Sequence, residues 1–485
     1  MEKNDTFIGS AEALGTNGEG IVKADGLTVF VPYLLPGERA EIKILKSKGG
    51  IAYGKALEIF TPAEERARPE CPVFTRCGGC QLQHIKYRYQ LKLKTKLVSD
   101  ALRKIGGINV KVNSCERSEK EYGYRNKLQL PIGRVNGKNV VGFYAERSHR
   151  IVPTNTCPIH PEWAERLIAA VYKFMETCGL DGYDETTGEG QLRHIVVREL
   201  KRKYIITLVT TEKEIAGIDY FLFLLDSIFQ EYSFFLNYHP ENTNVIFGEE
   251  FLLLKGRESY EAQEGGILYE AGASTFLQVN EGVRTKLYER AVSLVEEGET
   301  VIDCYAGGGL LTAMFARKCG KAFGIEIVPE ASKCANALKE KNGLHSRMRN
   351  FCGTVEEYLP KILAKEGGAV QFCSAARRAV NCNATAEPVR GGSATVVLDP
   401  PRSGVERSVI DAIKANGVQK VIMISCNPAT LARDLGLLTG SLKPNEKGEL
   451  VKVESEPDYE IELIQPFDMF PQTKHVETLC LLQKR

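Results

Sequence analysis

One cysteine in the last third of the chain has surroundings that could make its thiol reactive. Residues 421–435 read VIMISCNPATLARDL, in which a short apolar run ends at Cys426. Asn427 and Pro428 turn the chain there, and a helical segment follows. A thiolate close to a helix N-terminus is stabilised, which favours nucleophilic chemistry. Because cysteine is also a common core residue, this interpretation needs support from other motifs.

Two further motifs supply acid–base groups. LDPPRSG, residues 398–404, ends a strand-like run with Asp399. Ligands bind outside the carboxyl ends of parallel strands, so we expect this carboxylate in the same cleft as Cys426. QPFDMFPQTKHVETLCLL, residues 465–482, predicts a loop and a last strand, with His475 and Glu477 on one face by period-two alternation. Such groups could transfer protons.

A glycine-rich turn predicts a nucleotide-like ligand. VIDCYAGGGL, residues 301–310, is a strand that runs into three glycines and then a helix. Glycines there let a ligand approach the backbone closely. Glu326 ends the next strand-like run, AFGIEIV, where its carboxylate could accept hydrogen bonds from ribose hydroxyls. The pair indicates an adenosine ligand and leaves NAD and S-adenosylmethionine both open.

The clearest metal signal is CPVFTRCGGC, which places Cys71, Cys77 and Cys80 in a CxxxxxCxxC arrangement. A two-residue gap lets two thiolates reach one ion or cluster. A fourth thiol must come from elsewhere, and the candidates are Cys115, Cys157 and Cys178. Cys157 is preferred because a proline follows it, as one follows Cys71. The spacing leaves zinc and an iron–sulfur cluster open.

The length, charge and composition of the chain limit how these motifs can be positioned and what they can bind. Its 485 residues are too many for one compact core, so we expect two or three domains. Lys plus Arg number 63 against 62 Asp plus Glu, so any nucleic-acid binding must come from local patches. No apolar segment is long enough to span a bilayer and no signal segment opens the sequence, which predicts a cytoplasmic protein without membrane attachment. A reducing compartment favours metal binding or catalysis for clustered cysteines.

The pattern of apolar residues changes twice along the chain. Residues 6–60 alternate apolar runs with glycine-rich turns, which is typical of a small all-β barrel, and residues 61–70 read as a linker. Residues 120–285 mix strand-like and helical pieces, which indicates an α+β domain. After residue 285, strands and helices alternate, which predicts a doubly wound parallel sheet. Residues 361–394 lack a period, and we interpret them as an inserted loop.

A basic helix is expected at residues 87–105, where two glycines stop it. Its cations could touch RNA phosphates, and a solvated helix face explains them equally well. These cations are Arg88, Lys92, Lys94 and Lys96.

LDPPRSG, ISCNPATLARDL and FPQTKHVETLCLL, in this order, closely resemble the RNA uracil-5-methyltransferases. CPVFTRCGGC with the N-terminal barrel resembles the branch that acts on 23S ribosomal RNA. The resemblance implies a TRAM-like, OB-like RNA-binding barrel at 1–62 and a central α+β domain with the cysteine cluster at 63–285. A Rossmann-like methyltransferase domain would follow at 286–485, with the helix at 88–106 packed on it.

The resemblance also implies roles for single residues. Cys426 would add to C6 of uracil, Glu477 would remove the C5 proton, and Arg125 in YGYRNK would lie near the target base. S-adenosylmethionine would contact Gln278, Tyr305, Gly307, Glu326 and Asp399. A [4Fe-4S] cluster would bind Cys71, Cys77, Cys80 and Cys157. The chain departs from the family at Leu310 and Thr354, where polar or acidic residues are common.

Three functions compete at this stage. The favoured one is methylation of uridine in 23S rRNA by a monomer that needs no protein partner. The first alternative is the same chemistry on tRNA, although CPVFTRCGGC is unusual for that branch. The second is a non-catalytic RNA-binding iron–sulfur protein, which gives no reason for Cys426, Asp399 and Glu477 to be kept together.

Overall fold

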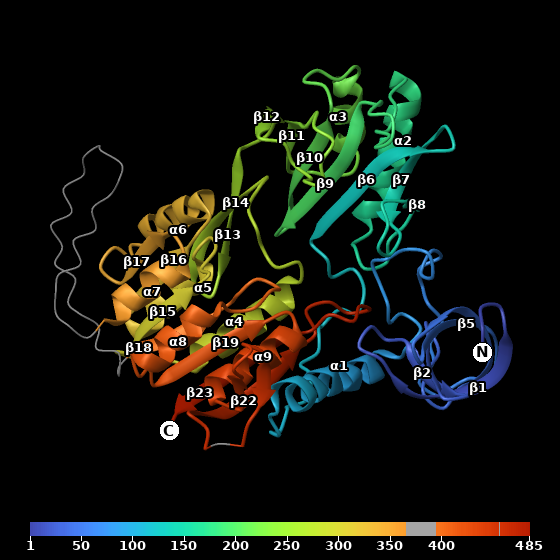
Figure 1. The fold of residues 1–485 in the computed structure, drawn as a ribbon. Helices are drawn as coiled ribbons and strands as arrows, with labels where there is room; N and C mark the ends of the chain where they lie inside the picture. Colours follow the sequence, from blue (N-terminus) through green and yellow to red (C-terminus); the bar gives the residue numbers. More distant parts are fainter. Residues whose placement is uncertain (365–393, 455) are drawn as a thin grey trace.

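The computed structural model describes residues 1–364, 394–454 and 456–485 (Figure 1). Most of the loop expected at 361–394 lies outside these residues. Its first three residues end helix α7 (Val355–Leu363), and Ala394 begins strand β18 (Ala394–Leu398). Within the described residues, no helix is both long and apolar enough to cross a membrane.

The N-terminal strands close into a barrel, which confirms the predicted all-β start. The strands are β1 (Thr6–Leu14), β2 (Gly20–Ala24), β3 (Leu27–Val31), β4 (Arg39–Lys48) and β5 (Ile51–Thr61), in the order β1-β2-β3-β5-β4. The segment after β5 is tied down rather than a free linker, because Arg66 forms two hydrogen bonds to buried Glu38, at 2.5 and 2.6 Å. Two parallel N–H donors on one carboxylate make a strong, directional pair.

A mixed sheet with two helices on one face forms the centre of the chain. Its strands are β6 (Lys127–Val135), β7 (Lys138–Tyr144), β8 (Ile151–Pro153), β9 (Leu192–Leu200), β10 (Lys203–Thr210), β11 (Tyr232–Tyr238) and β12 (Glu250–Lys255), in the order β12-β11-β10-β9-β6-β7-β8. Helices α2 (Trp163–Cys178) and α3 (Ile218–Asp226) share an apolar core with this sheet. On the opposite face of the sheet, β6 borders the neighbouring cavity.

The C-terminal part is the predicted doubly wound sheet, with two antiparallel strands added. Its strands are β15 (Thr300–Cys304), β16 (Lys321–Glu326), β17 (Met348–Cys352), β18, β19 (Lys420–Ser425), β22 (Tyr459–Phe467) and β23 (Glu477–Lys484), in the order β17-β16-β15-β18-β19-β23-β22. Its helices are α4 (Glu281–Ser293), α5 (Leu310–Cys319), α6 (Pro329–Lys341), α7, α8 (Arg407–Ala415) and α9 (Pro428–Thr439). The order reverses between β15 and β18, and ligands bind at such a switch point.

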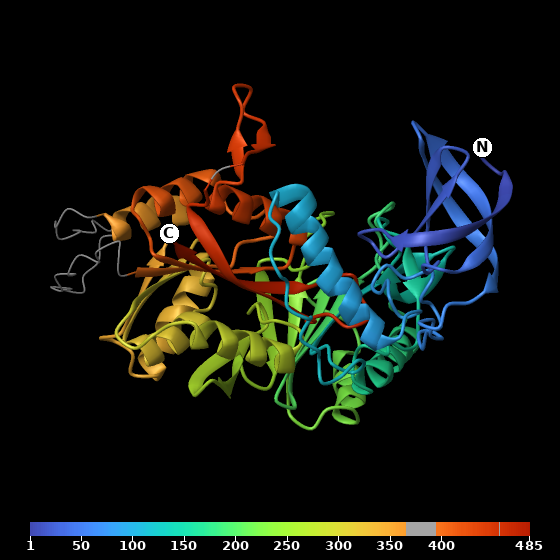
Figure 2. The same ribbon diagram turned by 90° about the horizontal axis from the view of Figure 1, so that it is seen from below.

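Two earlier segments dock on this α/β part. Helix α1 (Tyr87–Ala101) continues as a π turn over Leu102–Gly106 and lies against α9 (Figure 2). Gly106 permits this approach, since a Cβ there would lie 2.6 Å from the carbonyl oxygen of Ala432. Hairpin β13 (Ser259–Glu264) and β14 (Ile267–Gly272) packs beside α5 and α6. The division expected at residue 285 falls within α4, whose apolar face belongs to the same core. A short β20 (Leu442–Pro444) and β21 (Leu450–Lys452) pair projects from this part.

The docking of α1 corrects one expectation about its cations. Arg88, Lys92 and Lys96 are exposed, but the Lys94 side chain is fully buried and therefore does not reach RNA phosphates. Lys94 faces the segment before β23, because α1 turns that side toward the α/β part. Gly107, in the left-handed conformation at φ 67°, ends the helix as the sequence predicts.

Candidate active site between the α/β sheet and the central sheet

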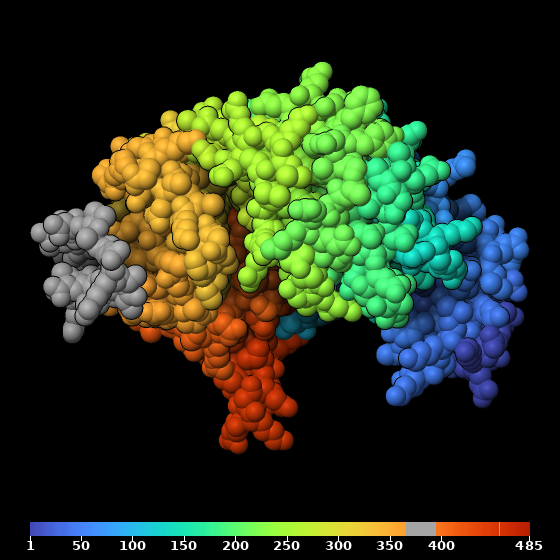
Figure 3. All heavy atoms as spheres, turned by 90° about the horizontal axis from the view of Figure 1, so that it is seen from above, coloured from blue at the N-terminus to red at the C-terminus, as the bar shows by residue number. Residues whose placement is uncertain are grey.

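A cavity of about 1450 Å³ separates the α/β part from the central part. Figure 3 shows a groove on this side, between the yellow-to-orange surface of the α/β part and the green surface of the central part. The carboxyl ends of β15, β16, β18 and β19 open into the cavity. Residues from β6 and from the cysteine segment form the facing wall.

The sheet topology brings Cys426 and Glu477 to one edge. Cys426 follows Ser425, which is the last residue of β19, and Ser425 pairs with Thr478 of antiparallel β23. Glu477 precedes Thr478, so it lies at the same end of the sheet as Cys426. Asp399 follows the last residue of neighbouring β18. Asp399, Cys426 and Glu477 all line the cavity.

Burial controls the protonation of this edge. It raises the pKa of Glu477 to about 8, with a further contribution from the Asp399 charge, while Arg402 acts in the opposite direction. Burial also raises the pKa of Asp399 to about 7. The pKa of the Cys426 thiol is raised by burial and then by Glu477, and the Arg402 guanidinium lowers it. The edge therefore holds protons near neutral pH until a cation or a substrate arrives.

The glycine-rich turn lies at the other end of this edge. Tyr305, directly after β15, has φ 67°, a left-handed conformation that is costly for an aromatic residue and typical of functional sites. The Gly307 amide donates to Glu326 Oε2 at 2.8 Å, and the Val328 amide donates to Oε1 at 2.8 Å. These two bonds hold the Glu326 carboxylate beside the glycines. Tyr305, Gly307 and Glu326 all line the cavity.

The loop between β14 and α4 connects this edge to the central sheet. Gln278 lines the cavity, and its carbonyl oxygen accepts a hydrogen bond from Asn126 Nδ2 at 3.3 Å. The Asn126 amide donates to Val279 O at 2.9 Å. Arg125, the residue before Asn126, also lines the cavity, and its Nε donates to Lys127 O at 3.3 Å. The predicted cofactor residue Gln278 and the predicted base-contacting Arg125 are thus on one cavity.

The two positions that depart from the family also face the cavity. Leu310 is buried at the start of α5, and Thr354 is the N-cap residue of α7. The Thr354 hydroxyl accepts a hydrogen bond from the Glu357 amide at 3.2 Å, so its oxygen already serves the helix.

Four cysteines line the far end of the same cavity, and they are Cys71, Cys77, Cys80 and Cys157. Burial raises the pKa of each thiol, to about 12 for Cys80, and the four charges would repel one another. Within the described residues, no group of His, Cys, Asp and Glu side chains is already arranged around a metal position. Cys115 instead lies near the Lys94–Asp468 pair, and the Cys178 sulfur lies beside Gly217. The four predicted ligands therefore share one end of the cavity, where burial favours their neutral thiol form.

Comparison with known families decides the class of protein. The model of the family described as tRNA (uracil-5-)-methyltransferase matches residues 230–485, and the TRAM domain model matches residues 11–57. This chain belongs to the tRNA (uracil-5-)-methyltransferase family. The TRAM match falls within the closed barrel, which confirms the predicted TRAM domain.

Relatives of this uracil-5-methyltransferase family member match along its whole length. A protein of Clostridium tetani described as an RNA methyltransferase is 34% identical, with 99% of this chain and 97% of the relative covered. A similarly described protein of Listeria innocua is 34% identical, with 99% and 98% covered. The structure of Pyrococcus abyssi tRNA (uracil-54, C5)-methyltransferase with S-adenosyl-L-homocysteine covers 98% of this chain and 100% of its own, at TM-score 0.71 and 23% identity. The predictions of an RNA methyltransferase and of its catalytic fold are confirmed.

Burial and nearby acids act against the helix at the family member's predicted nucleophile. Cys426 does lie before helix α9, but the pKa of its thiol is raised rather than lowered. Asn427 caps the helix by accepting from the Ala429 amide at 3.1 Å, so a free backbone donor that would favour a thiolate is taken. Burial, Glu477 and Asp399 raise the pKa of the thiol, and Arg402 lowers it.

Three residues of the site were missed by reasoning from the sequence. Arg402 follows the two prolines of LDPPRSG, and its guanidinium lies within hydrogen-bond reach of Cys426. Its carbonyl oxygen accepts from Asn427 Nδ2 at 3.2 Å, which joins the two motifs. Asp303, buried in β15, lines the cavity and accepts a hydrogen bond from Thr312, and burial raises its pKa to about 7. A carboxylate inside an apolar strand was the available signal. Phe470 lines the cavity as well, whereas His475 packs edge-on against it and lies in the turn before β23.

Proposed function

We propose that this family member transfers a methyl group from S-adenosylmethionine to C5 of a uridine in 23S rRNA through a covalent bond between Cys426 and C6. The observation that carries the proposal is the meeting of Cys426, Asp399 and Glu477 at one cavity edge. A thiol nucleophile and a buried carboxyl are the groups that this substitution needs.

Each group has a distinct part in the proposed reaction. The Cys426 thiolate forms a bond to C6, and the C5–C6 π electrons move toward C5 and O4 as an enolate. C5 then attacks the sulfonium methyl group, and S-adenosylhomocysteine leaves. Glu477 takes the proton from C5, the C6–sulfur bond breaks, and the thiolate returns. Arg402 stabilises that thiolate, because its guanidinium favours the charged form.

The methyl donor is proposed to occupy the glycine-loop end of the cavity. Its contacts would be Gln278, Tyr305, Gly307, Glu326 and Asp399. Glu326 is already held toward the glycines by two backbone amides, which suits a carboxylate that receives ribose hydroxyls. The sulfonium is a cation, so its arrival lowers the pKa of the buried Asp399 and Glu477 carboxyls and favours loss of the Glu477 proton before the methyl group is transferred.

The RNA is proposed to enter from the side of the central sheet. Arg125 and Lys127 line that wall, and Arg198 lies opposite Lys127 in the sheet register. Within the described part of the chain, none of these three cations has a carboxylate within ion-pair distance. Uncompensated cations beside a cavity favour an anionic ligand such as an RNA phosphate. Arg125 is placed to stabilise negative charge on the uracil oxygen.

The four cysteines at the far end of the cavity, which we call the cysteine wall, support assignment to the 23S rRNA branch. Cys71, Cys77, Cys80 and Cys157 would supply the four thiolates of a [4Fe-4S] cluster. A bound cluster would cross-link the segment after the barrel to the loop before α2. The proposal divides the chain near residues 62 and 285, with α1 and hairpin β13–β14 docked on the third part. All proposed site residues come from one chain, so a monomer suffices.

Methylation of tRNA is the second candidate. The similarity in fold to the Pyrococcus abyssi enzyme, whose description names tRNA, favours it. Catalytic chemistry would be the same, and only the RNA would differ.

Trapping the covalent intermediate tests both candidates. Purified enzyme is mixed with S-adenosylmethionine and RNA containing 5-fluorouridine, either as 23S rRNA fragments or as tRNA. Fluorine at C5 cannot leave as a proton, so the adduct accumulates and survives denaturant. We expect an adduct with one 23S fragment that is lost in Cys426→Ala. Cys352→Ala, an exposed cysteine at the end of β17, is the matched control and should form the adduct normally.

The possible outcomes separate the parts of the proposal. An adduct with tRNA alone would move the substrate to the second candidate and keep the mechanism. An adduct that persists in Cys426→Ala would overturn the nucleophile. Methyl transfer without any adduct on either RNA would overturn the covalent route.

A further inference from the structure

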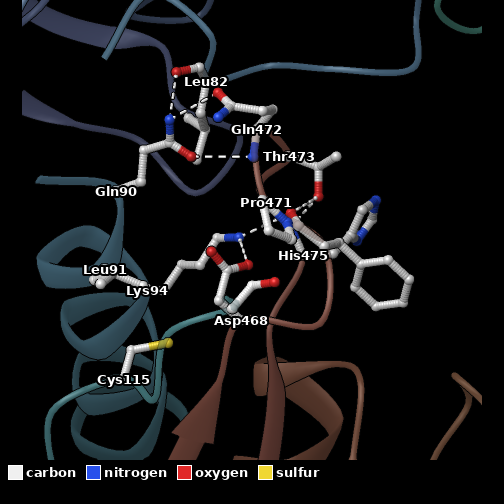
Figure 4. A network of polar contacts seen from close by, with 12 residues as sticks. Leu82, Gln90, Leu91, Lys94, Cys115, Asp468, Pro471, Gln472, Thr473 and His475 are labelled. Carbon is white, nitrogen blue, oxygen red and sulfur yellow. Dashed lines mark hydrogen bonds and ion pairs between the residues drawn. The ribbon is translucent and has the colours of Figure 1, made fainter. Parts of the chain in front are cut away.

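A buried polar network joins α1 to the segment that leads into β23 (Figure 4). Lys94 Nζ lies 2.5 Å from Asp468 Oδ1 and donates to the carbonyl oxygen of Phe470 at 3.0 Å. Both charged side chains are 0% exposed. The two residues are 374 positions apart in the sequence, so only the docking of α1 brings them together.

A pair of amide side chains extends the network by one helical turn. Gln90 Nε2 donates to Gln472 Oε1 at 2.9 Å, and the backbone N–H of Gln472 donates to Gln90 Oε1 at 3.1 Å. Gln90 Nε2 also donates to the carbonyl oxygens of Leu82 and Ile85, at 3.1 and 2.9 Å. Residues 468–473, which we call the clamp segment, are therefore held at two points by one helix face.

The clamp segment forms further hydrogen bonds with three other segments of the chain. The Tyr124 hydroxyl donates to Pro471 O at 3.0 Å, and the Asp468 amide donates to Glu116 O at 2.8 Å. The amides of Gln81 and Leu82, next to the cysteine wall, both donate to Gln472 O, at 3.1 and 2.9 Å. Its backbone is therefore fixed by segments of the predicted central domain.

Stability alone does not account for this arrangement. Burying a Lys–Asp pair costs about as much as the pair returns, and a well-packed apolar pair of similar volume is often as stable. Asp468 Oδ2 is buried without a hydrogen-bond partner among the described residues, which adds to the cost. The charged pair instead fixes the orientation of the clamp segment, because Lys94 holds both the Asp468 carboxylate and the Phe470 backbone.

The orientation of the clamp segment affects two residues of the cavity. Phe470 and Glu477 both line the cavity, at the two ends of the turn that starts in the clamp segment. Shifting this turn would move the ring and the carboxyl together. An error of about 1 Å in the position of a reacting group can cost roughly 10²-fold in rate.

We propose that Lys94 and Gln90 are positioning residues of the reaction, which hold the clamp segment so that Glu477 meets the C5 proton and Phe470 borders the base. The inference rests on the proposed covalent function, because its readout is the removal of that proton. Neither residue lines the cavity.

Ordinary uridine RNA supplies a readout that separates positioning from folding. Adduct formation needs Cys426, whereas release of the adduct needs Glu477. A misplaced Glu477 therefore leaves methylated adduct on unmodified RNA, where the normal enzyme releases it. The variants are Lys94→Met and Gln90→Met, with Glu477→Gln as the benchmark and Lys104→Met, an exposed cation on the same helical segment, as the control. We expect turnover to fall about 10²-fold in Lys94→Met, while the denaturant-stable adduct rises toward the Glu477→Gln level.

A folding defect is controlled by a second variant. Lys94→Met leaves Asp468 buried without a partner, so Lys94→Met/Asp468→Leu is measured beside it by thermal unfolding and by adduct level. The double variant should recover stability and still accumulate adduct. Parallel loss of turnover and adduct in both variants, or normal turnover in both, would overturn the inference. Accumulation in Glu477→Gln but in neither Lys94 variant overturns this inference alone. No accumulation in Glu477→Gln overturns the role of Glu477, and this inference with it.

Discussion

The two faces of the cavity carry opposite charges, and burial acts on each in the opposite direction. On the α/β edge, burial raises the pKa of Asp399 to about 7 and that of Glu477 to about 8. On the central sheet, burial lowers the pKa of Lys127 to about 8 and that of Arg198 to about 10. Near neutral pH the two carboxyls therefore keep much of their proton, whereas Lys127 and Arg198 stay mainly cationic. The difference suits a cationic methyl donor on one face and an anionic RNA on the other.

The cysteines repeat this contrast. Cys426 has a guanidinium beside it, which can hold its thiolate while the nucleophile works. Burial is the main cause of the raised pKa of Cys71, Cys77 and Cys157, and neighbouring cysteines raise the pKa of Cys77 and Cys157 further. The first arrangement favours a thiolate that can act as a nucleophile, whereas the second favours neutral thiols.

The largest expected effect concerns the cysteine wall. In Cys80→Ser, one of four thiolates is lost, and we expect iron per chain to fall at least about tenfold after anaerobic reconstitution. Cys178→Ser is the control, because Cys178 lies beside Gly217 and away from the four thiols. Iron and sulfide assays with the visible absorption spectrum measure the result. Iron retained in Cys80→Ser and lost in Cys178→Ser would mean that Cys178 is a ligand and Cys80 is not, and would break the contrast between the two kinds of thiol.

The raised pKa of Glu477 predicts that the stability of the protein depends on pH. The pKa of Glu477 is about 8 in the folded protein and near 4.5 in the unfolded chain, so the folded state keeps its proton longer. Below the unfolded value both states are protonated, and as pH rises toward 8 the unfolded state ionises first and gains. The free energy of unfolding should therefore fall between about pH 5 and pH 8, by at most about 1.4 kcal/mol per pH unit for this group.

Glu477→Gln tests that slope by urea unfolding across the same range. The variant removes the titrating group, so its free energy of unfolding should decline less steeply with pH. Glu462→Gln, an exposed carboxyl on neighbouring β22, is the control and should keep the original slope. An unchanged slope in Glu477→Gln would mean that the carboxyl is ionised in the folded protein and that the edge does not hold protons.

The positions of site residues at strand ends could be predicted from the sequence. Asp399, Cys426 and Glu326 follow apolar runs, and parallel strands bring their carboxyl ends to one edge, so a shared cleft could be predicted. Membership of the family and the barrel also followed from motifs. The iron–sulfur ligands, the base contact of Arg125 and the choice of 23S rRNA stay predictions.

The rest depended on long-range contacts that no local pattern contains. Antiparallel β23 inserts beside β19, and this register alone puts Glu477 next to Cys426. The basic helix pattern gave no sign that Lys94 would be buried, because its partner Asp468 lies near the other end of the chain. The raised pKa of Cys426 likewise comes from burial and from Glu477, neither of which is visible around the cysteine itself.

The smallest expected effect concerns the cationic wall. Lys127→Met removes one cation that faces the cavity, and we expect RNA affinity to weaken about tenfold near 0.15 M salt. If Lys127 neutralises one phosphate, the slope of log affinity against log salt should fall by about 0.7 for single-stranded RNA. Lys138→Met, an exposed lysine on β7, is the control for a general loss of charge. Equal slopes for Lys127→Met and the unchanged enzyme would mean that Lys127 meets no phosphate. The lowered pKa of Lys127 would then reflect only its burial beside other cations. The electrostatic argument for ligand binding would hold only for the methyl-donor face of the cavity.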